Sequence, residues 1–240
     1  MFLNLIENTL LLSDVHYNKK RTKLLELLNK IGSKEICVSQ IILMGDIFDF
    51  LCIENNFFIS KNKNAIDLLN KISKDIPIIY LEGNHDYNLS DIFHNIIVFP
   101  REQQPIQAII NDKDSKNDQK IVSLNHGDLF ISFIYSIYCK IIRNSIFLKI
   151  LGILDINDIF SKRVHNKLIN KYICSDISYF EILAKNRTKY FKEDIIIEGH
   201  YHQGKSYKFK NKEYINIPSF ECSSEYSIIN NGEFKNIKFL

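Results

Sequence analysis

The chain of 240 residues and 28.2 kDa is long enough for one domain with a large buried core, and its 45% hydrophobic content excludes a disordered chain. Its net charge of +3 excludes no class of partner. No charge-free stretch of about 18 apolar residues occurs and the N-terminus has no basic segment, so neither a transmembrane span nor a signal peptide is expected.

Short apolar runs predict five strands in chain order. They are Thr9–Ser13, Ile41–Met44, Ile78–Leu81, Ile121–Asn125 and Ile195–Glu198. Nearly continuous apolar runs of this length are typical of strands buried on both faces. Helical patterns at Arg21–Ile31 and Asn64–Ile72 separate the first three strands. This alternation predicts an α/β fold.

The pattern changes after residue 202, where β-prone runs follow one another. They are Lys205–Phe209, Glu213–Ile217, Tyr226–Ile229 and Lys235–Phe239, with Asn231-Gly232 between the last two. Asn-Gly between such runs is a hairpin signal. The polar stretch 111–119 predicts a surface loop. Residues 1–240 are therefore expected to form one domain of two packed mixed β-sheets flanked by helices, an α+β four-layer arrangement.

Residues 129–192 predict a helical cap inserted beside the site, because they are helix-patterned and far too long for an ordinary connection. The segment has eleven Lys/Arg against four Asp/Glu, whereas the rest of the chain is net negative. The basic side chains suit an anionic ligand or membrane surface, or form a solvated face. Its apolar stripe indicates either core packing or contact with lipid.

A polar block follows each predicted strand. The blocks are Asp14-Val15-His16, Gly45-Asp46-Ile47-Phe48-Asp49, Gly83-Asn84-His85-Asp86, His126-Gly127-Asp128 and Gly199-His200-Tyr201-His202. The carboxyl ends of strands in open α/β sheets meet at one edge, so the blocks are expected to converge. Asp, Asn and His are ligands for divalent cations, and one carboxylate can span two of them. The blocks predict a two-metal centre bridged by Asp46, although any single block is also explained by capping side chains.

The order D-x-H, G-D-x-x-D, G-N-H-D, H-G-D and G-H-x-H resembles that of the calcineurin-like metallophosphoesterase family over residues 9–202. The resemblance implies a dinuclear centre that shares Asp46 and hydrolyses phosphate esters. One metal would take Asp14, His16, Asp46 and His202, and the other would take Asp46, Asn84, His126 and His200. His85 would contact the phosphate and assist the leaving group, oriented by Asp86. Two Mn²⁺ ions are expected, with Fe, Zn or a mixed pair as alternatives.

Within that superfamily the chain most resembles the UDP-2,3-diacylglucosamine diphosphatases of lipid A synthesis, on S-D-V-H, G-D-I-F-D, H-G-D and the insertion before G-H-x-H. It differs from their best-known branch at His85 and Tyr201, where that branch has Arg and Thr. The resemblance implies a lipid-linked nucleotide sugar as substrate, with UMP and 2,3-diacylglucosamine 1-phosphate as products. The expected location is cytoplasmic or on the inner face of the cytoplasmic membrane, with an anionic membrane surface as a partner through the cap.

Other functions remain open on the sequence. A soluble phosphoesterase of nucleotides or phosphoproteins is the main alternative, and a non-catalytic scaffold is disfavoured because no ligand is missing. A nucleic acid partner is not expected, because the basic residues lie in an apolar insertion. No oligomeric state is predicted.

The remaining chemically interesting residues have less specific interpretations. Asp49 is expected to support a ligand or bind directly, and Asp128 either caps the first helix of the cap or serves the site. His94 and His165 are expected on the surface or in the cap. The five cysteines are scattered and odd in number, which predicts a reducing compartment, no disulfide framework and inert buried thiols.

Overall fold

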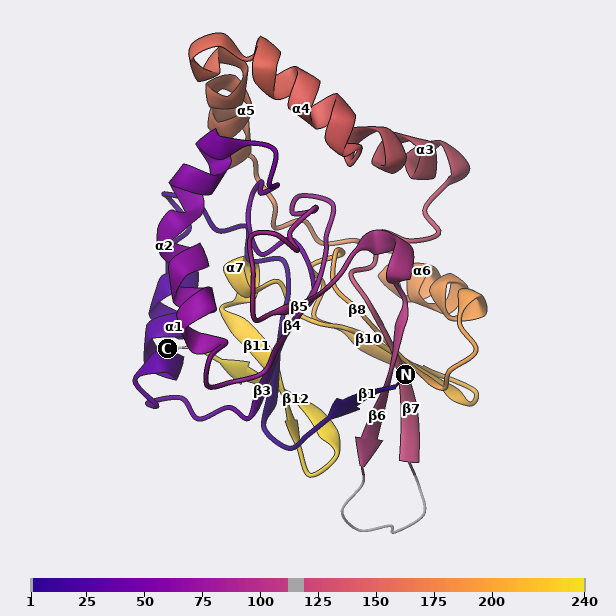
Figure 1. The fold of residues 1–240 in the computed structure, drawn as a ribbon. Helices are drawn as coiled ribbons and strands as arrows, with labels where there is room; N and C mark the ends of the chain where they lie inside the picture. The colour runs from indigo at the N-terminus through magenta and orange to yellow at the C-terminus, as the bar shows by residue number, and fades with distance from the viewer. Residues whose placement is uncertain (1, 112–118, 240) are drawn as a thin grey trace.

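The computed structural model describes residues 2–111 and 119–239, in which two six-stranded mixed sheets pack against each other (Figure 1). The first sheet has the order β1 (Leu3–Leu5), β6 (Ile106–Asn111), β7 (Gln119–Asn125), β8 (Ile195–Glu198), β10 (Lys212–Asn216) and β9 (Ser206–Phe209). The second has the order β12 (Glu233–Lys238), β11 (Glu225–Asn230), β2 (Thr9–Leu12), β3 (Gln40–Leu43), β4 (Ile78–Leu81) and β5 (Ile97–Phe99). The two predicted mixed sheets are confirmed.

Alternation along β2 shows how the layers form. Leu11 packs into the core between the sheets with residues such as Ile42 and Ile197, whereas Leu10 and Leu12 pack under the helices on the outer face. Successive side chains of a strand point to opposite faces, so a strand covered on both sides needs apolar residues throughout. The near-continuous apolar runs in the sequence have this cause.

Helices cover the outer faces of both sheets. α1 (Lys23–Gly32) and α2 (Asn56–Ile72) lie on the second sheet, and α6 (Phe180–Arg187) packs on the first (Figure 1). α1 buries Leu24, Leu27, Leu28 and Ile31, the spacing of one helix face. The short α7 (Phe220–Ser223) follows β10, and three 3₁₀ turns lie at Arg101–Gln103, Ile156–Asp158 and Thr188–Tyr190. Together these layers give the four-layer α/β architecture.

Three further helices, α3 (Phe133–Ile142), α4 (Ser145–Leu154) and α5 (Ile159–Ile169), form an arch beyond the sheets (Figure 1), and we call them the cap helices. α4 buries none of its residues, and α3 buries only Cys139. α3 and α4 therefore contribute little to the core, whereas α5 buries Ser161, His165 and Ile169. No helix in residues 2–111 and 119–239 has both the length and the hydropathy needed to cross a bilayer.

Some elements differ from the sequence predictions. α2 begins at Asn56 instead of Asn64, because the side chain of Asn55 accepts a hydrogen bond from the backbone of Phe58 and starts the helix earlier. β1, β5 and β6 have no predicted counterpart. Of the predicted loop at 111–119, residues 112–118 lie outside the described residues, while Asn111 and Gln119 belong to β6 and β7.

Candidate metal centre

The five polar blocks converge because each follows the carboxyl end of β2, β3, β4, β7 or β8. Five predicted ligands have positive φ: Asp14 (51°), His16 (49°), Asp46 (52°), His200 (64°) and His202 (62°). Non-glycine residues enter this left-handed region at a cost, and such strain clusters at functional sites. The backbone is thus bent at these positions to aim the side chains inward.

Asp14, His16 and His202 form one cluster of potential ligands. His202 Nε2 lies 3.1 Å from Asp14 Oδ1, and the rings of His16 and His202 have centroids 5.3 Å apart. Asp14 is fully buried, and its other oxygen, Oδ2, accepts hydrogen bonds from Ser13 Oγ and from the backbone of His200. The cluster has the donor types that a divalent cation requires.

Asp46, His126 and His200 form a second cluster, and Asn84 adjoins it. Nε2 of His126 lies 3.2 Å from Asn84 Oδ1 and 3.3 Å from His200 Nδ1. Gly45 permits the approach of the buried His126, since a Cβ there would meet His126 Nδ1 at 2.4 Å. All four side chains direct potential ligand atoms to one small volume.

Asp46 stands between the two clusters. Its Oδ1 lies 3.6 Å from His126 Nε2, and its Oδ2 lies 3.9 Å from His16 Nε2. The predicted bridging position is therefore geometrically suitable, because the two oxygens of one carboxylate face different clusters.

The buried carboxylates and imidazoles of the two clusters shift one another's pKa values. Burial alone would raise the pKa of Asp46, but nearby His126, His85 and His16 hold it well below its ordinary value. Burial would lower the pKa of His126, yet Asp46 and Asp14 raise it to about 9. By contrast, burial and the neighbouring His126 lower the pKa of His200 to about 4.

The hydrogen bonds made by the buried ligand atoms show whether the two clusters suit metal ions. Both ring nitrogens of His16 are buried without a hydrogen-bond partner, and Asp14 Oδ1 has His202 Nε2 as its neighbour at 3.1 Å. Nδ1 of His126 faces the carbonyl of Met44, and Nδ1 of His202 faces that of Ile173. A carbonyl only accepts, so in each ring Nδ1 carries the hydrogen and the neutral ring presents Nε2 to the centre. The donor set fits two cations.

His85 and Asp86 do not form the predicted pair, and that prediction is wrong. Nδ1 of His85 lies 2.6 Å from the carbonyl oxygen of Asp49. Asp86 is fully buried and accepts hydrogen bonds from the backbone of Asp46, Ile47, Phe48 and Gly83 and from the hydroxyl of Tyr80. It fixes the loop that carries Asp46, whereas Asp49 orients His85 through its backbone.

Supporting residues surround the ligands. Asp49 accepts hydrogen bonds from Arg21 and Asn18, and its Oδ1 lies 3.5 Å from Nδ1 of His16, the contact expected of a residue that supports a ligand. Arg21 and Asn18 lie outside the motifs, so the sequence did not single them out. Tyr80 is a polar group in a buried apolar strand, and a tyrosine in such a run is itself a sequence signal for a buried hydrogen bond.

Asp128 does not cap the first cap helix, so that interpretation is wrong. It is fully buried and accepts a hydrogen bond from Arg101, while Ser132 caps α3. His94 is exposed, as expected, and His165 lies in α5 but is buried, with its ring against Phe57.

The prediction that the cysteines form no disulfide is wrong for one pair, whereas that of buried thiols is confirmed for Cys52 and Cys139. Cys174 and Cys222 form a disulfide, Cys37 is exposed, and only Cys52 and Cys139 are buried free thiols. The pair was missed because 48 residues separate the two cysteines and only the fold brings them together.

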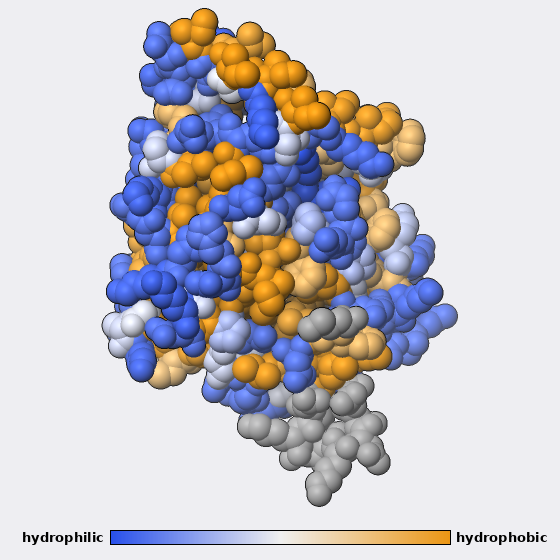
Figure 2. Space-filling model, in the orientation of Figure 1, coloured by the Kyte–Doolittle hydropathy of each residue, from blue (hydrophilic) through white to orange (hydrophobic). Residues whose placement is uncertain are grey.

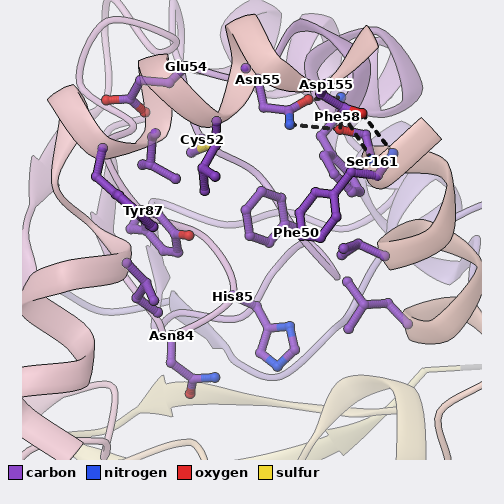
Figure 3. A pocket seen from close by; sticks show the side chains of 18 of the residues that line it. Phe50, Cys52, Glu54, Asn55, Phe58, Asn84, His85, Tyr87, Asp155 and Ser161 are labelled. Atoms are coloured by element: carbon purple, nitrogen blue, oxygen red, sulfur yellow. Dashed lines mark hydrogen bonds between the residues drawn. The ribbon is translucent and has the colours of Figure 1, made fainter. Parts of the chain in front are cut away.

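A cavity of about 360 Å³ opens between the cap helices and the body, with Asn84 and His85 at its edge (Figure 3). Its walls are mainly apolar: Phe50, Phe58, Tyr87, Tyr135, Tyr138, Ile142, Phe147, Leu148, Leu151, Phe160, Val164 and Leu168. Pockets of this size and character hold small amphipathic ligands.

The outer faces of α3 and α4 are apolar and exposed, so core packing does not explain that part of the stripe. Phe133, Ile134, Ile146 and Ile153 are each at least 71% exposed. Two of the basic residues have structural roles: Arg187 is paired with Glu198, and the buried Arg143 donates to the carbonyl of Gly83.

Comparison with known proteins gives one family match. The model of the calcineurin-like phosphoesterase family matches residues 8–204. No curated protein matches the chain.

Among solved structures, similar chains include the Escherichia coli phosphoesterase Yfce, with 12% identity, coverage of 96% of this chain and 92% of that chain, and a TM-score of 0.47. A novel archaeal phosphodiesterase has 14% identity, coverage of 96% and 99%, and a TM-score of 0.41. A dimetal phosphatase from Danio rerio has 13% identity, coverage of 97% and 98%, and a TM-score of 0.42.

Proposed function

The chain belongs to the calcineurin-like phosphoesterase family of metal-dependent hydrolases, and from this premise we propose that it cleaves the diphosphate of UDP-2,3-diacylglucosamine. The products are UMP and 2,3-diacylglucosamine 1-phosphate. The observation that carries the proposal is the apolar cavity beside the ligand clusters, which suits a substrate with a phosphate head and acyl chains.

The metal ligands are proposed residue by residue. Asp14, His16, Asp46 and His202 hold one cation, and Asp46, Asn84, His126 and His200 hold the other. When bound, two divalent cations supply an activated water and neutralise charge on the phosphate. Mn²⁺ is the proposed metal, and Fe or Zn fit the same donors.

His85 is the proposed proton donor to the leaving oxygen. Its Nδ1 is held by the carbonyl of Asp49, so Nε2 is the ring atom available to a substrate. The residue lies at the edge of the cavity, opposite the end formed by Asn55 and Asp155 (Figure 3), and its ring adjoins His16 and Asp46 of the ligand clusters. A positioned histidine of this kind contributes to catalysis by proton transfer in the transition state.

Acyl chains are proposed to lie in the cavity under the cap helices. Leu148 and Leu151 of α4 and Leu168 of α5 line it from one side, and Phe50 and Phe58 line it from the other. Glu54, Asn55, Asp155 and Ser161 form a polar end away from His85 (Figure 3). An apolar path that starts at His85 would hold chains attached to the sugar beside the phosphate.

An anionic membrane surface is the proposed partner of the cap helices, since it would present the lipid-linked substrate. The exposed apolar residues form a band along α4 and α3 (Figure 2). The charged residues of these two helices, Lys140 and Lys149, are both basic and exposed. Apolar insertion together with attraction of lysines to anionic lipid is how interfacial helices bind. The proposed location is therefore the inner face of the cytoplasmic membrane.

The test compares substrates in detergent with Mn²⁺ present. UMP release is measured from UDP-2,3-diacylglucosamine and from UDP-glucosamine without acyl chains, beside a chromogenic phosphodiester. The proposal predicts strong preference for the diacylated substrate. Equal rates with and without acyl chains would contradict it and favour a phosphoesterase of nucleotides or phosphoproteins.

A matched pair of variants on one helix sharpens this test. Leu151 lines the cavity, whereas Ile153 is 80% exposed on the other side of α4. Leu151→Gln is expected to raise KM for the diacylated substrate about tenfold, since lost apolar contact is worth roughly 1–3 kcal/mol. It should leave the chromogenic diester unaffected, and Ile153→Gln should leave both reactions unchanged in detergent, where no bilayer is present for the outer face of α4 to contact. An identical KM for the two variants would contradict an acyl site under the cap.

A further inference from the structure

The segment that joins α5 to α6, residues 170–179, contains neither helix nor strand, and we call it the α5–α6 link. It passes beside the His202 loop: the carbonyl of Ile173 accepts from His202 Nδ1 at 2.8 Å, and the carbonyl of Ser175 accepts from Gln203 Nε2. The carbonyl of Ile173 therefore fixes which nitrogen of His202 faces Asp14.

The disulfide ties this link to an anchored element. Cys174 adjoins Ile173 and is bonded to Cys222 of α7, with their Cα atoms 5.5 Å apart. Ser219, which caps α7, donates its hydroxyl to the backbone carbonyl of Asp14 at 2.8 Å. The residue after Ser219 donates its backbone N–H to Ser13. α7 is thus fixed at the end of β2, where Asp14 begins the first polar block.

These contacts form a closed circuit that includes two proposed ligands of one cation, Asp14 and His202. From Asp14 the circuit passes through Ser219 to Cys222, across the disulfide to Cys174, and through the Ile173 carbonyl to His202. It closes where His202 Nε2 lies 3.1 Å from Asp14 Oδ1. Every step is a covalent bond, a hydrogen bond or this short contact, so the cross-link constrains the distance between the two ligands.

We propose that the Cys174–Cys222 disulfide is a positioning device for His202, and that its reduction weakens cation binding at the Asp14–His16–His202 cluster. The inference rests on the proposed role of His202 as a metal ligand. Both cysteines are partly exposed, so a small thiol reaches the bond. Without the cross-link the α5–α6 link is held by fewer contacts, because it lacks the ladder of a helix or strand.

The redox step is an ordinary thiol–disulfide exchange with a dithiol reductant. A thiolate of the reductant attacks one sulfur, and the other cysteine leaves as its thiolate. The second thiol of the reductant then closes its own disulfide and releases the first cysteine. The protein gains two electrons and two protons when its cysteines become thiols, and the dithiol supplies these electrons and protons as it is oxidised to a disulfide.

The first measurement counts thiols with a chromogenic disulfide in denaturant, on protein purified without reductant. Of the five cysteines, three should react. Reaction of all five would overturn the inference.

The second measurement is the affinity for Mn²⁺ of the oxidised protein and of protein reduced after folding and then freed of reductant under anaerobic conditions. Reduction should weaken one of two Mn²⁺ sites about tenfold or more, the typical effect of removing a residue that orients a ligand. Cys174→Ser/Cys222→Ser should reproduce the weakened site and ignore the reductant, whereas Cys37→Ser should respond as the wild type does. If the double variant does not fold, the reduced wild-type chain provides the comparison.

A double-mutant cycle separates positioning from general stability. In His202→Ala the weakened site is already lost, so reduction should change Mn²⁺ binding no further. An additional loss in that background would overturn the positioning role. Oxidised protein that binds two Mn²⁺ tightly and ignores reduction would overturn this inference alone, whereas protein that binds no Mn²⁺ in either state would overturn the proposed function as well.

Discussion

Oδ1 of Asp46 lies 3.6 Å from Nε2 of His126, and the two buried groups shift each other's pKa in opposite directions, that of Asp46 down and that of His126 up. His126 has a pKa raised to about 9, from an ordinary value of 6.5. Metal-free protein therefore carries a proton on His126 at neutral pH, where a cation would otherwise bind.

Binding of Mn²⁺ should consequently displace this proton. We expect the apparent affinity to rise by up to about tenfold per pH unit from pH 6.5 towards 9 and then level off. The same proton stabilises the metal-free fold below pH 6.5, and that contribution is lost as the pH rises through 9. Calorimetric titrations in buffers of different ionisation enthalpy would count the released protons, and an affinity that is flat across this range would contradict the expectation.

Asp86 should behave as a structural residue of the Asp46 loop. Asp86→Ala removes the acceptor of five hydrogen bonds, and the free energy of unfolding should fall by about 3 kcal/mol or more. Tyr80→Phe removes one of them and should cost about 1 kcal/mol. Urea unfolding of the two variants checks this order, and equal, negligible losses would show that Asp86 holds no such loop.

Substitution of His85 should lower the catalytic rate without loss of the bound metals. His85→Ala should lower kcat by roughly 10²–10⁴-fold while two Mn²⁺ ions still bind. His94→Ala, at an exposed position, serves as the control and should keep full activity. Loss of one Mn²⁺ in His85→Ala would instead make His85 a ligand, and an active variant would remove it from the mechanism.

The apolar outer face of the cap helices should bind anionic lipid. Ile134 and Ile146 are 78% and 71% exposed, and their joint change to Glu should abolish cosedimentation with phosphatidylglycerol vesicles. The chromogenic diester should still be hydrolysed at the wild-type rate. Ile97→Glu, on the edge strand β5 and 58% exposed, is the control. Vesicle binding that survives the double change would place the membrane contact elsewhere or exclude it.

The convergence of the site was predictable because the rule that brings it together is local. A short apolar run followed by a polar block implies a buried strand and a carboxyl-end loop, and parallel neighbours place such loops on one edge. Asp46 was predicted as the bridge because the two oxygens of one carboxylate can span two cations, and the family resemblance implied the same position.

Features that depend on distant contacts were missed or misassigned. Asp86 lies next to His85 in sequence, but its carboxylate turns to the Asp46 loop because three backbone N–H groups there need an acceptor. The partner of Cys174 follows from the placement of α7. The apolar stripe of α3 and α4 has a helical period whether it faces a core or solvent, so periodicity alone did not determine its environment.

The most direct test of the account is UMP release from UDP-2,3-diacylglucosamine by wild-type protein and by Asp46→Ala, each with its bound Mn²⁺ counted. Asp75→Asn, at an exposed acid remote from the blocks, serves as the matched control. We predict two Mn²⁺ and rapid release for the wild type and the control, with loss of both metal binding and UMP release in Asp46→Ala. An Asp46→Ala protein that still binds two ions and releases UMP would contradict a centre built around this carboxylate.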